Sequence, residues 1–264
     1  MIDEDTLMSF AHFFSDERQL EKDYLVNLML KVFSINKIST DTEFKGGTAL
    51  YMFHSLDRFS EDLDFTYTGK DTGIASHIDS FLVPVLKDFK LSYVISKNKG
   101  NVLVKDPDGR IYGMRTELFV DGPLFATTGV RHKLKLDISF RNDTIMEPEP
   151  ARMTSKYADI GTILLPKMRI EEMLAEKFSA IVERTKARDL YDAYFMIKFK
   201  GMKYNQELVM EKMRKRGENF DRNLLERKIK TFKESLWREE LSSLLKALPK
   251  LPEVKSMLLG ALDS

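Results

Sequence analysis

The sequence contains no cysteine, no long apolar segment and almost no net charge. The absence of cysteine excludes disulfides, thiolate zinc sites and cysteine nucleophiles, and it fits a reducing compartment. No apolar run approaches the roughly 18 residues that a bilayer-spanning helix needs, and the acidic start of the chain lacks the pattern of a signal peptide. We therefore expect a cytoplasmic protein with no membrane partner. The formal net charge of +1 creates no overall positive field, so any RNA-binding surface must be local.

The length and texture of the chain favour two parts. Its 264 residues can bury one substantial core or two modest ones. Short apolar segments and glycine turns between residues 43 and 140 predict strands with interspersed helices, whereas the chain beyond residue 170 has helical periodicity. The prolines of residues 147–150 (EPEP) favour a linker or sharp turn between these regions. We expect an α/β (α+β) domain over residues 1–150 and a helical bundle over residues 151–264.

Several residues suggest where helices begin and end. Ser15 is the expected cap of the first long helix, Gly217 is a stop, and Asp221 caps a restart. The basic stretch of residues 212–216 (KMRKR) is interpreted as a solvated helix face, with RNA contact as the alternative.

A two-glycine turn in residues 44–53 (FKGGTALYMF) is the first candidate for ligand binding. The pattern predicts a strand end, then a turn at Gly46 and Gly47, then a helix whose N-cap is Thr48. Backbone N–H groups at the positive end of a helix attract phosphate oxygens, and the Thr48 hydroxyl would add a donor. An ordinary capped turn has the same sequence, so this motif is weak by itself.

Two aspartates follow the glycines in residues 58–65 (RFSEDLDF). In a strand, residues i and i+2 share a face, so Asp62 and Asp64 would project together while Leu63 and Phe65 enter the core. Two carboxylates on one side make half of a metal site, although a solvated strand end gives the same pattern.

Residues 133–140 (KLKLDISF) alternate between polar and apolar, which predicts a strand with Asp137 on its polar face. Three carboxylates on adjacent strands can hold two hard cations about 4 Å apart, as in two-metal phosphoryl chemistry. Asp137 is therefore the expected third ligand, and Glu117 is the competing one.

Two further charged residues fall on helices beyond residue 170. Lys177 lies inside the apolar stripe of Met173, Leu174, Phe178 and Ile181, so it either extends to solvent or contacts nucleotide phosphates. Asp189 opens an almost wholly apolar helix and needs a partner. That partner is either an arginine, Arg184 or Arg188, or a bound substrate.

These pieces, in this order, resemble the AbiEii/AbiGii-type nucleotidyltransferase toxins of toxin–antitoxin and abortive-infection systems, relatives of the MenT toxins. Residues 21–24 (EKDY) resemble the family's N-terminal signature, and residues 44–50 with 58–64 resemble its first catalytic motif. Residues 135–138 (KLDI) are similar to the second motif, although the family often has Glu where Asp137 stands. Residues 172–177 with Arg184, and residues 186–192 (KARDLYD), resemble the third and fourth.

The resemblance implies a polymerase-β-like core with a mixed sheet, joined to a helical domain that completes the active cleft. By motif position, Asp62, Asp64 and Asp137 would be metal ligands and catalytic, and Lys177 and Asp189 would also act in catalysis. Gly46, Gly47, Thr48, Ser60 and Lys177 would bind the nucleotide.

We therefore expect transfer of an NMP from an NTP to a hydroxyl, with Mg²⁺ or Mn²⁺ as cofactor. The acceptor would be an RNA, plausibly a tRNA 3′ end, and a cognate antitoxin would restrain the enzyme. Transfer onto a protein side chain and a non-catalytic nucleotide-binding module are the alternatives. A two-metal nuclease could also use three acids, but the glycine turn gives it no advantage.

Overall fold

The computed structural model describes residues 1–70, 93–95, 102–105, 109 and 111–263. Contacts within the chain divide it into two compact units. The sheet unit comprises Met1–Thr48, Glu61–Arg141 and Pro150–Lys167, and the helical unit comprises Ala49–Ser60, Asn142–Glu149 and Met168–Ser264. The sequence placed a boundary near residue 150. The two units divide the chain at several points instead, because the last strands of the sheet follow residue 148 and two short segments that precede residue 150 join the helices.

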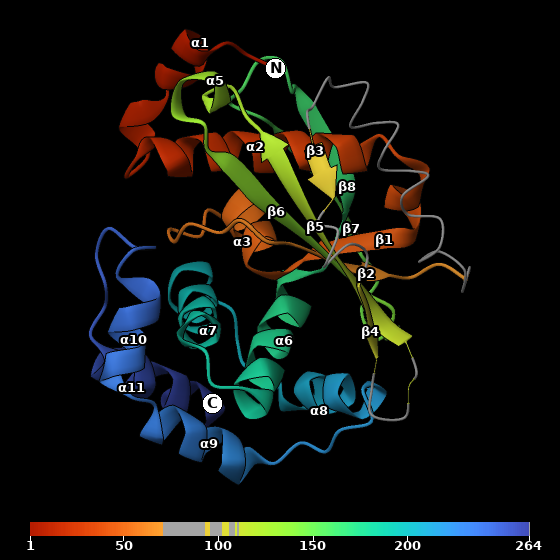
Figure 1. The fold of residues 1–264 in the computed structure, drawn as a ribbon. Coiled ribbons are helices and arrows are strands. Elements are labelled where there is room, and N and C mark those ends of the chain that lie inside the picture. The colour runs from red at the N-terminus through yellow and green to blue at the C-terminus, as the bar shows by residue number, and fades with distance from the viewer. Residues whose placement is uncertain (71–92, 96–101, 106–108, 110, 264) are drawn as a thin grey trace. The chain divides into compact units, whose positions relative to one another are not determined.

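Within the part of the chain that the structure describes, the sheet unit is built on an eight-stranded mixed sheet, which confirms the predicted fold class (Figure 1). The strand order is β3-β5-β6-β2-β1-β8-β7, with β4 paired to β5. Strand β2 is antiparallel to β1 and parallel to β6, and β6 is antiparallel to β5. The bounds are β1 Thr42–Lys45, β2 Leu63–Tyr67, β3 Tyr93–Ile95, β4 Val102–Lys105, β5 Ile111–Asp121, β6 Arg131–Ser139, β7 Glu149–Thr154 and β8 Thr162–Lys167.

The alternation of polar and apolar residues fixes the two faces of the central strands. Along β6, Leu134, Leu136 and Ile138 are buried, while the residues between them are partly exposed. Leu63 and Phe65 of β2 are buried in the same way, as the sequence predicted. The long helix α2 (Glu17–Ser34) packs on β6 and β8, which leaves the polar side chains of β2 and β6 on the other face.

The described residues of the sheet unit also form the short helical segments α1 (Glu4–Met8), η1 (Ala11–Phe13), η2 (Lys37–Asp41) and α5 (Phe125–Thr128). The N-cap of α2 is Asp16, whose carboxylate accepts the backbone N–H of Gln19 at 2.7 Å. Ser15 was the predicted cap, and this prediction is wrong by one residue because aspartate and serine are equally good caps.

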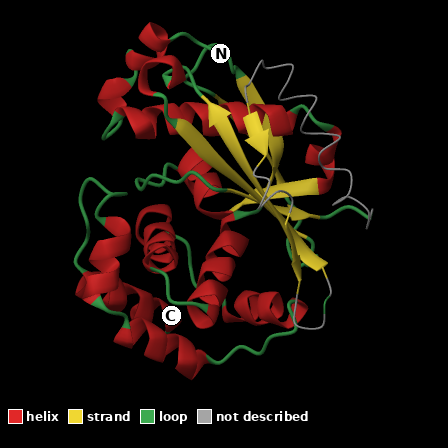
Figure 2. Cartoon of the chain, viewed as in Figure 1, coloured by secondary structure: helices red, strands yellow, loops and turns green. Residues whose placement is uncertain are grey.

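The helical unit contains α6 (Ile170–Glu183), α7 (Ala187–Lys200), α8 (Gln206–Lys215), α9 (Arg222–Thr231), α10 (Glu234–Leu241) and α11 (Leu251–Leu262), joined by loops (Figure 2). Helix α7 packs against α6, α10 and α11, and most of its residues are buried, as its apolar sequence predicted. The predicted break at Gly217, which has a φ of +77°, and the cap at Asp221 are confirmed. Within the described residues, no helix is both long enough and apolar enough to cross a bilayer.

The interpretation of residues 212–216 as a solvated face is wrong for two of its basic residues. Lys212 is fully buried, and its ammonium lies 2.5 Å from Oε1 of Glu172, which is also fully buried. Arg216 is only 9% exposed and forms ion pairs with Asp143, Glu176 and Glu183. The basic stretch alone did not indicate this burial, because the acids that pair with Lys212 and Arg216 are remote in sequence and most of them lie on α6.

Candidate active site

The polar face of the sheet carries a row of charged residues across four strands. In the strand register, Lys45 of β1 lies opposite Asp64 of β2, and Asp64 lies beside Asp137 of β6. Asp137 in turn lies opposite Arg115 of β5. Residues paired across neighbouring strands project to the same face, about 5 Å apart. Two carboxylates are therefore adjacent at the centre of this row, with a cation on each side.

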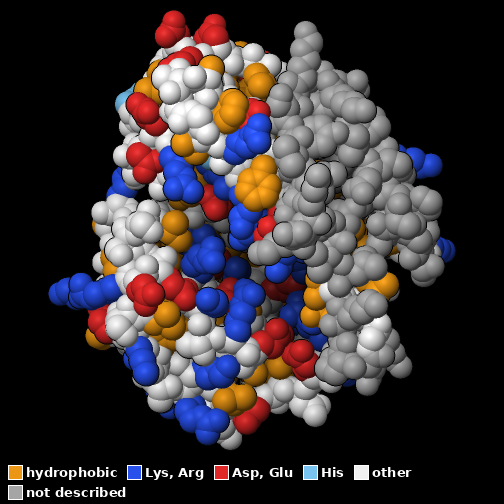
Figure 3. Space-filling view, in the orientation of Figure 1, with side chains coloured by type: hydrophobic (Ala, Val, Ile, Leu, Met, Phe, Trp, Pro, Cys, Tyr) orange, Lys and Arg blue, Asp and Glu red, His pale blue; other side chains and the backbone are white. Residues whose placement is uncertain are grey.

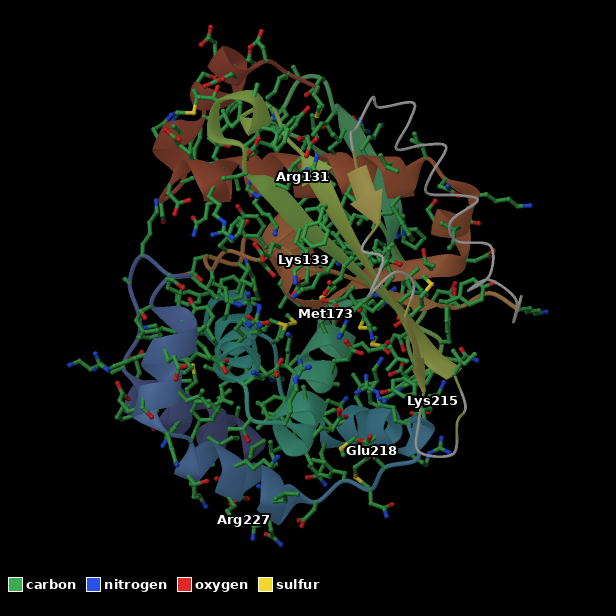
Figure 4. All side chains as sticks on the ribbon, in the orientation of Figure 1. Arg131, Lys133, Met173, Lys215, Glu218 and Arg227 are labelled. Carbon is green, nitrogen blue, oxygen red and sulfur yellow. The ribbon has the colours of Figure 1, made fainter. Side chains whose placement is uncertain are left out.

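A second row lies one step along the same face. Asp62 directly precedes β2, and its Oδ1 lies 3.4 Å from the Nζ of Lys135 on β6. Lys135 is paired in register with Glu117 of β5, whose Oε1 is 3.5 Å from the Nζ of Lys133. Asp137 is thus on the strand next to β2, whereas its competitor Glu117 is one strand further away. Figure 4 labels Lys133 on β6.

Arg115 of β5 forms an ion pair with Asp137, one of the three aspartates of the predicted metal site. Its Nε lies 2.7 Å from Oδ1 of Asp137, and its Nη2 lies 3.1 Å from Oδ2, a two-bond pair. The hydrogen bond to Asp137 raises the pKa of Arg115 above its ordinary value, and the charges of Asp137, Asp62 and Asp64 add to the increase. Arg115 thus contacts Asp137 directly, and Asp62 and Asp64 act on it through their charge.

The glycine turn abuts the cluster. Gly46 is the first residue of α3 (Gly46–His54) and has a φ of +78°, which favours glycine. A Cβ at this position would stand 2.5 Å from Oδ2 of Asp64, so any other residue would displace that carboxylate. Gly47 is buried in the first turn of the helix, and Ser60 is half-buried two residues before Asp62.

Thr48 is the third residue of α3, so the prediction that it is the N-cap is wrong. The helix begins directly after β1, without the expected turn between them. The Thr48 side chain is fully buried, and its hydroxyl donates to the backbone carbonyl of Asp62 at 2.5 Å. This bond holds Asp62 beside the helix start.

The donor set fits a hard divalent cation. Asp64 and Asp137 are paired across β2 and β6, Asp62 directly precedes β2, and carboxylate oxygens suit Mg²⁺ or Mn²⁺. Among the residues that the structure describes, no three acidic or histidine side chains are close enough together to hold a metal ion. Arg115 and Lys135 neutralise Asp137 and Asp62 where a metal would otherwise do so.

Within the helical unit, Lys177 belongs to a buried network centred on Asp192. Asp192 is fully buried; its Oδ2 lies 2.7 Å from the Nζ of Lys177, and Arg58 binds both of its oxygens, at 2.6 and 2.8 Å. Burial alone would raise the pKa of Asp192, but the charges of Arg58 and Lys177 outweigh burial and lower it. Lys177 is only 12% exposed, so the interpretation that it extends to solvent is wrong.

Asp189 connects the same network to the surface. Arg184 binds its carboxylate with two hydrogen bonds, of 2.8 and 3.1 Å, and the Nζ of Lys177 lies 3.3 Å away. Burial alone would raise the pKa of Asp189, but Lys177 and Arg184 lower it. The ion pair with Arg184, one of the two expected alternatives, is present. The predicted contacts of Asp189 and Lys177 with substrate stay predictions.

Sequence reasoning missed Arg115, Arg58 and Asp192. Arg115 could have been found from its spacing, because it lies two residues before Glu117 and shares its face on β5. Arg58 and Asp192 are 134 residues apart, and nothing local to either residue indicates that they meet. On the face that Figure 3 shows, acidic and basic side chains are interspersed, which agrees with the net charge of +1.

Comparison with known proteins shows one family match. The sequence model of a family described as "Nucleotidyl transferase AbiEii toxin, Type IV TA system" matches residues 28–258. No curated protein matches at the threshold applied.

Solved structures are similar in fold. MenT4, a nucleotidyltransferase toxin of Mycobacterium tuberculosis, is 17% identical, with a TM-score of 0.67 over 100% of this chain and 91% of its own. JHP933 from Helicobacter pylori is 22% identical, with a TM-score of 0.59 over 94% and 91%. A putative nucleotidyltransferase from H. pylori is 23% identical, with a TM-score of 0.58 over 94% of each chain.

Proposed function

The chain belongs to the family of AbiEii nucleotidyl transferase toxins of type IV toxin–antitoxin systems, and from this premise we propose that it transfers an NMP from an NTP to a hydroxyl of an RNA. A tRNA 3′ end is the acceptor that we favour. Mg²⁺ is the proposed cofactor, with Mn²⁺ as a substitute.

The observation that carries this proposal is the placement of three aspartates on one face of β2 and β6. Asp64 and Asp137 are register neighbours, and Asp62 lies one step along the same face. Gly46, at the start of α3, packs directly against Asp64, so a helix start adjoins these acids. The arrangement supports Asp137 over Glu117 as the third ligand.

Asp62, Asp64 and Asp137 would hold the divalent cations. Bound there, such cations would activate the attacking hydroxyl and stabilise charge on the nucleotide phosphates. The chain's own contribution is positional. Gly46 and Gly47 place the backbone N–H groups of the α3 start beside Asp64, where phosphate oxygens can accept from them. Thr48 fixes Asp62 through its backbone carbonyl.

The proposed roles of Ser60, Lys177 and Asp189 rest on their motif positions. Lys177 has a pKa that burial alone would lower, but Asp192 and Asp189 outweigh burial and raise it, so its ammonium is charged at neutral pH. Lys177 is charged and 12% exposed, which supports a contact with a phosphate. That contact would replace the longer of its two ion pairs, the one with Asp189 at 3.3 Å.

The acceptor and the antitoxin are the least constrained parts of the proposal. The near-zero net charge requires an RNA acceptor to be recognised by a local surface. A cognate antitoxin partner follows from the family description.

The test is a transfer assay with the full chain, Mg²⁺, total RNA and each of four α-labelled NTPs in turn. We expect one NTP to label RNA, and the label to disappear when Asp64 is replaced by Asn. Label on a protein instead would establish the side-chain alternative. NTP binding without any label would establish the non-catalytic nucleotide-binding module, and the absence of both label and metal-dependent NTP binding would refute the proposal.

A further inference from the structure

We propose that Arg115 is the internal counter-ion of the three-aspartate site: it holds Asp137 while the site is free of metal, and it exchanges that carboxylate for the nucleotide's phosphates when a divalent cation binds. This inference rests on the proposed function. It assigns to Arg115 a role that none of the family motifs covers.

The geometry provides the first support. The two-bond pair between Arg115 and Asp137, at 2.7 and 3.1 Å, engages both oxygens of a carboxylate that would otherwise face a cation. Asp64 is the register neighbour of Asp137, so the guanidinium stands one strand away from the centre of the acid cluster. Metal and Arg115 cannot both take the same lone pairs of Asp137.

Exposure supports the exchange. The Arg115 side chain is 54% exposed and that of Asp137 is 27% exposed, so the pair is partly hydrated. Ion pairs in such positions are weak and their partners can separate at little cost. A guanidinium released beside the metal site keeps its charge, and its planar donors match phosphate oxygens as well as they match a carboxylate.

The chain contains a matched control on the same two strands. Arg131 and Asp121 are also opposite each other in the β5–β6 register, and their two bonds measure 2.6 and 3.3 Å. Arg131, labelled in Figure 4, is six residues from Asp137 along β6, or about 20 Å.

The experiment measures Mn²⁺ binding to the full chain without nucleotide, by electron paramagnetic resonance, for the wild type, Arg115→Gln and Arg131→Gln. Removal of the competing cation should tighten Mn²⁺ binding by Arg115→Gln about fivefold, which is about 1 kcal/mol. Arg131→Gln should bind Mn²⁺ like the wild type. Arg115→Lys, which keeps the charge but loses the two-bond geometry, should lie between.

The second measurement is NTP binding at saturating Mn²⁺, where Arg115→Gln should bind about tenfold more weakly and Arg131→Gln should be unchanged. Tighter metal binding with weaker nucleotide binding is an outcome that a merely structural arginine would not produce. Unchanged or weaker Mn²⁺ binding by Arg115→Gln refutes the counter-ion role, and unchanged NTP binding refutes the phosphate contact.

Failure of this inference is distinguishable from failure of the proposed function. If the wild type binds Mn²⁺ and labels RNA while Arg115→Gln behaves like the wild type, only the role of Arg115 is refuted. If the wild type binds no Mn²⁺, the three-aspartate site and the inference that depends on it both fail.

Discussion

Replacement of Asp192 by Asn should destabilise the helical unit strongly, because this carboxylate is fully buried between two cations. Arg58 is 2% exposed and donates two hydrogen bonds to Asp192, and Lys177 donates a third contact. Removing one partner of a buried ion pair costs about 3–5 kcal/mol, since the other charge stays buried without compensation. The Asn amide oxygen keeps one acceptor, so we expect about 3 kcal/mol.

The assay is urea unfolding followed by the fluorescence of Trp237. The chain contains one tryptophan, and it is fully buried in the helical unit, 6.2 Å from the ring of Tyr191. With an m-value of about 2 kcal/mol/M, a loss of about 3 kcal/mol lowers the midpoint by roughly 1.5 M. Arg184→Gln is the matched control: Arg184 is 60% exposed and Asp189 keeps the Nζ of Lys177 at 3.3 Å, so the loss should be smaller, about 1 kcal/mol.

The pH dependence gives an independent test. The pKa of Asp192 is lowered in the folded protein, so its stabilising contribution is present above its ordinary pKa of 3.8 and disappears as the pH falls through the folded value. The difference between wild type and variant should therefore be constant between about pH 5 and pH 7 and should narrow in strong acid. A midpoint for Asp192→Asn within about 0.3 M of the wild type at pH 7 would refute the reasoning.

Two further substitutions test other local arguments. Gly46→Ala should lower the transfer rate at least about tenfold, because its Cβ would meet Asp64 and displace the carboxylate, whereas Gly201→Ala, also at positive φ but in open space, should leave activity unchanged. Steady-state kinetics with labelled NTP would decide between these outcomes, and equal activity of the two variants would contradict the role of Gly46.

Lys212→Met should lower the free energy of unfolding in urea by about 3 kcal/mol, because it leaves the buried carboxylate of Glu172 without its cation. Lys215→Met on the same helix should lower it by less than about 1 kcal/mol. Equal losses would contradict the burial argument.

The features that the sequence could predict are periodic or local. The alternation of residues 133–140 predicted the strand, its buried leucines and the face of Asp137, and all three are confirmed. The apolar stripe of α6 and the cap at Asp221 were equally predictable, because each depends on residues within a few positions. The spacing of Asp62 and Asp64 around Leu63 likewise predicted that Leu63 would be buried.

The features that could not be predicted depend on partners remote in sequence. Lys212 was assigned to a solvated face because its neighbours are basic, yet Glu172, 40 residues away, makes its burial possible. Thr48 had the sequence of a helix cap, but its hydroxyl donates to Asp62, 14 residues later. Arg115 was overlooked because its partner Asp137 becomes its neighbour only through the register of β5 and β6.

The central claim is that the carboxylates of β2 and β6 form a catalytic metal site, and a matched pair of substitutions tests it most directly. Asp137→Asn and Asp121→Asn each remove a carboxylate that binds an arginine through two bonds between the same two strands. The measurement is the rate of NMP transfer from labelled NTP in Mg²⁺. We predict a loss of at least about 100-fold for Asp137→Asn and little change for Asp121→Asn. Equal rates for the two variants, with both folded, would contradict it.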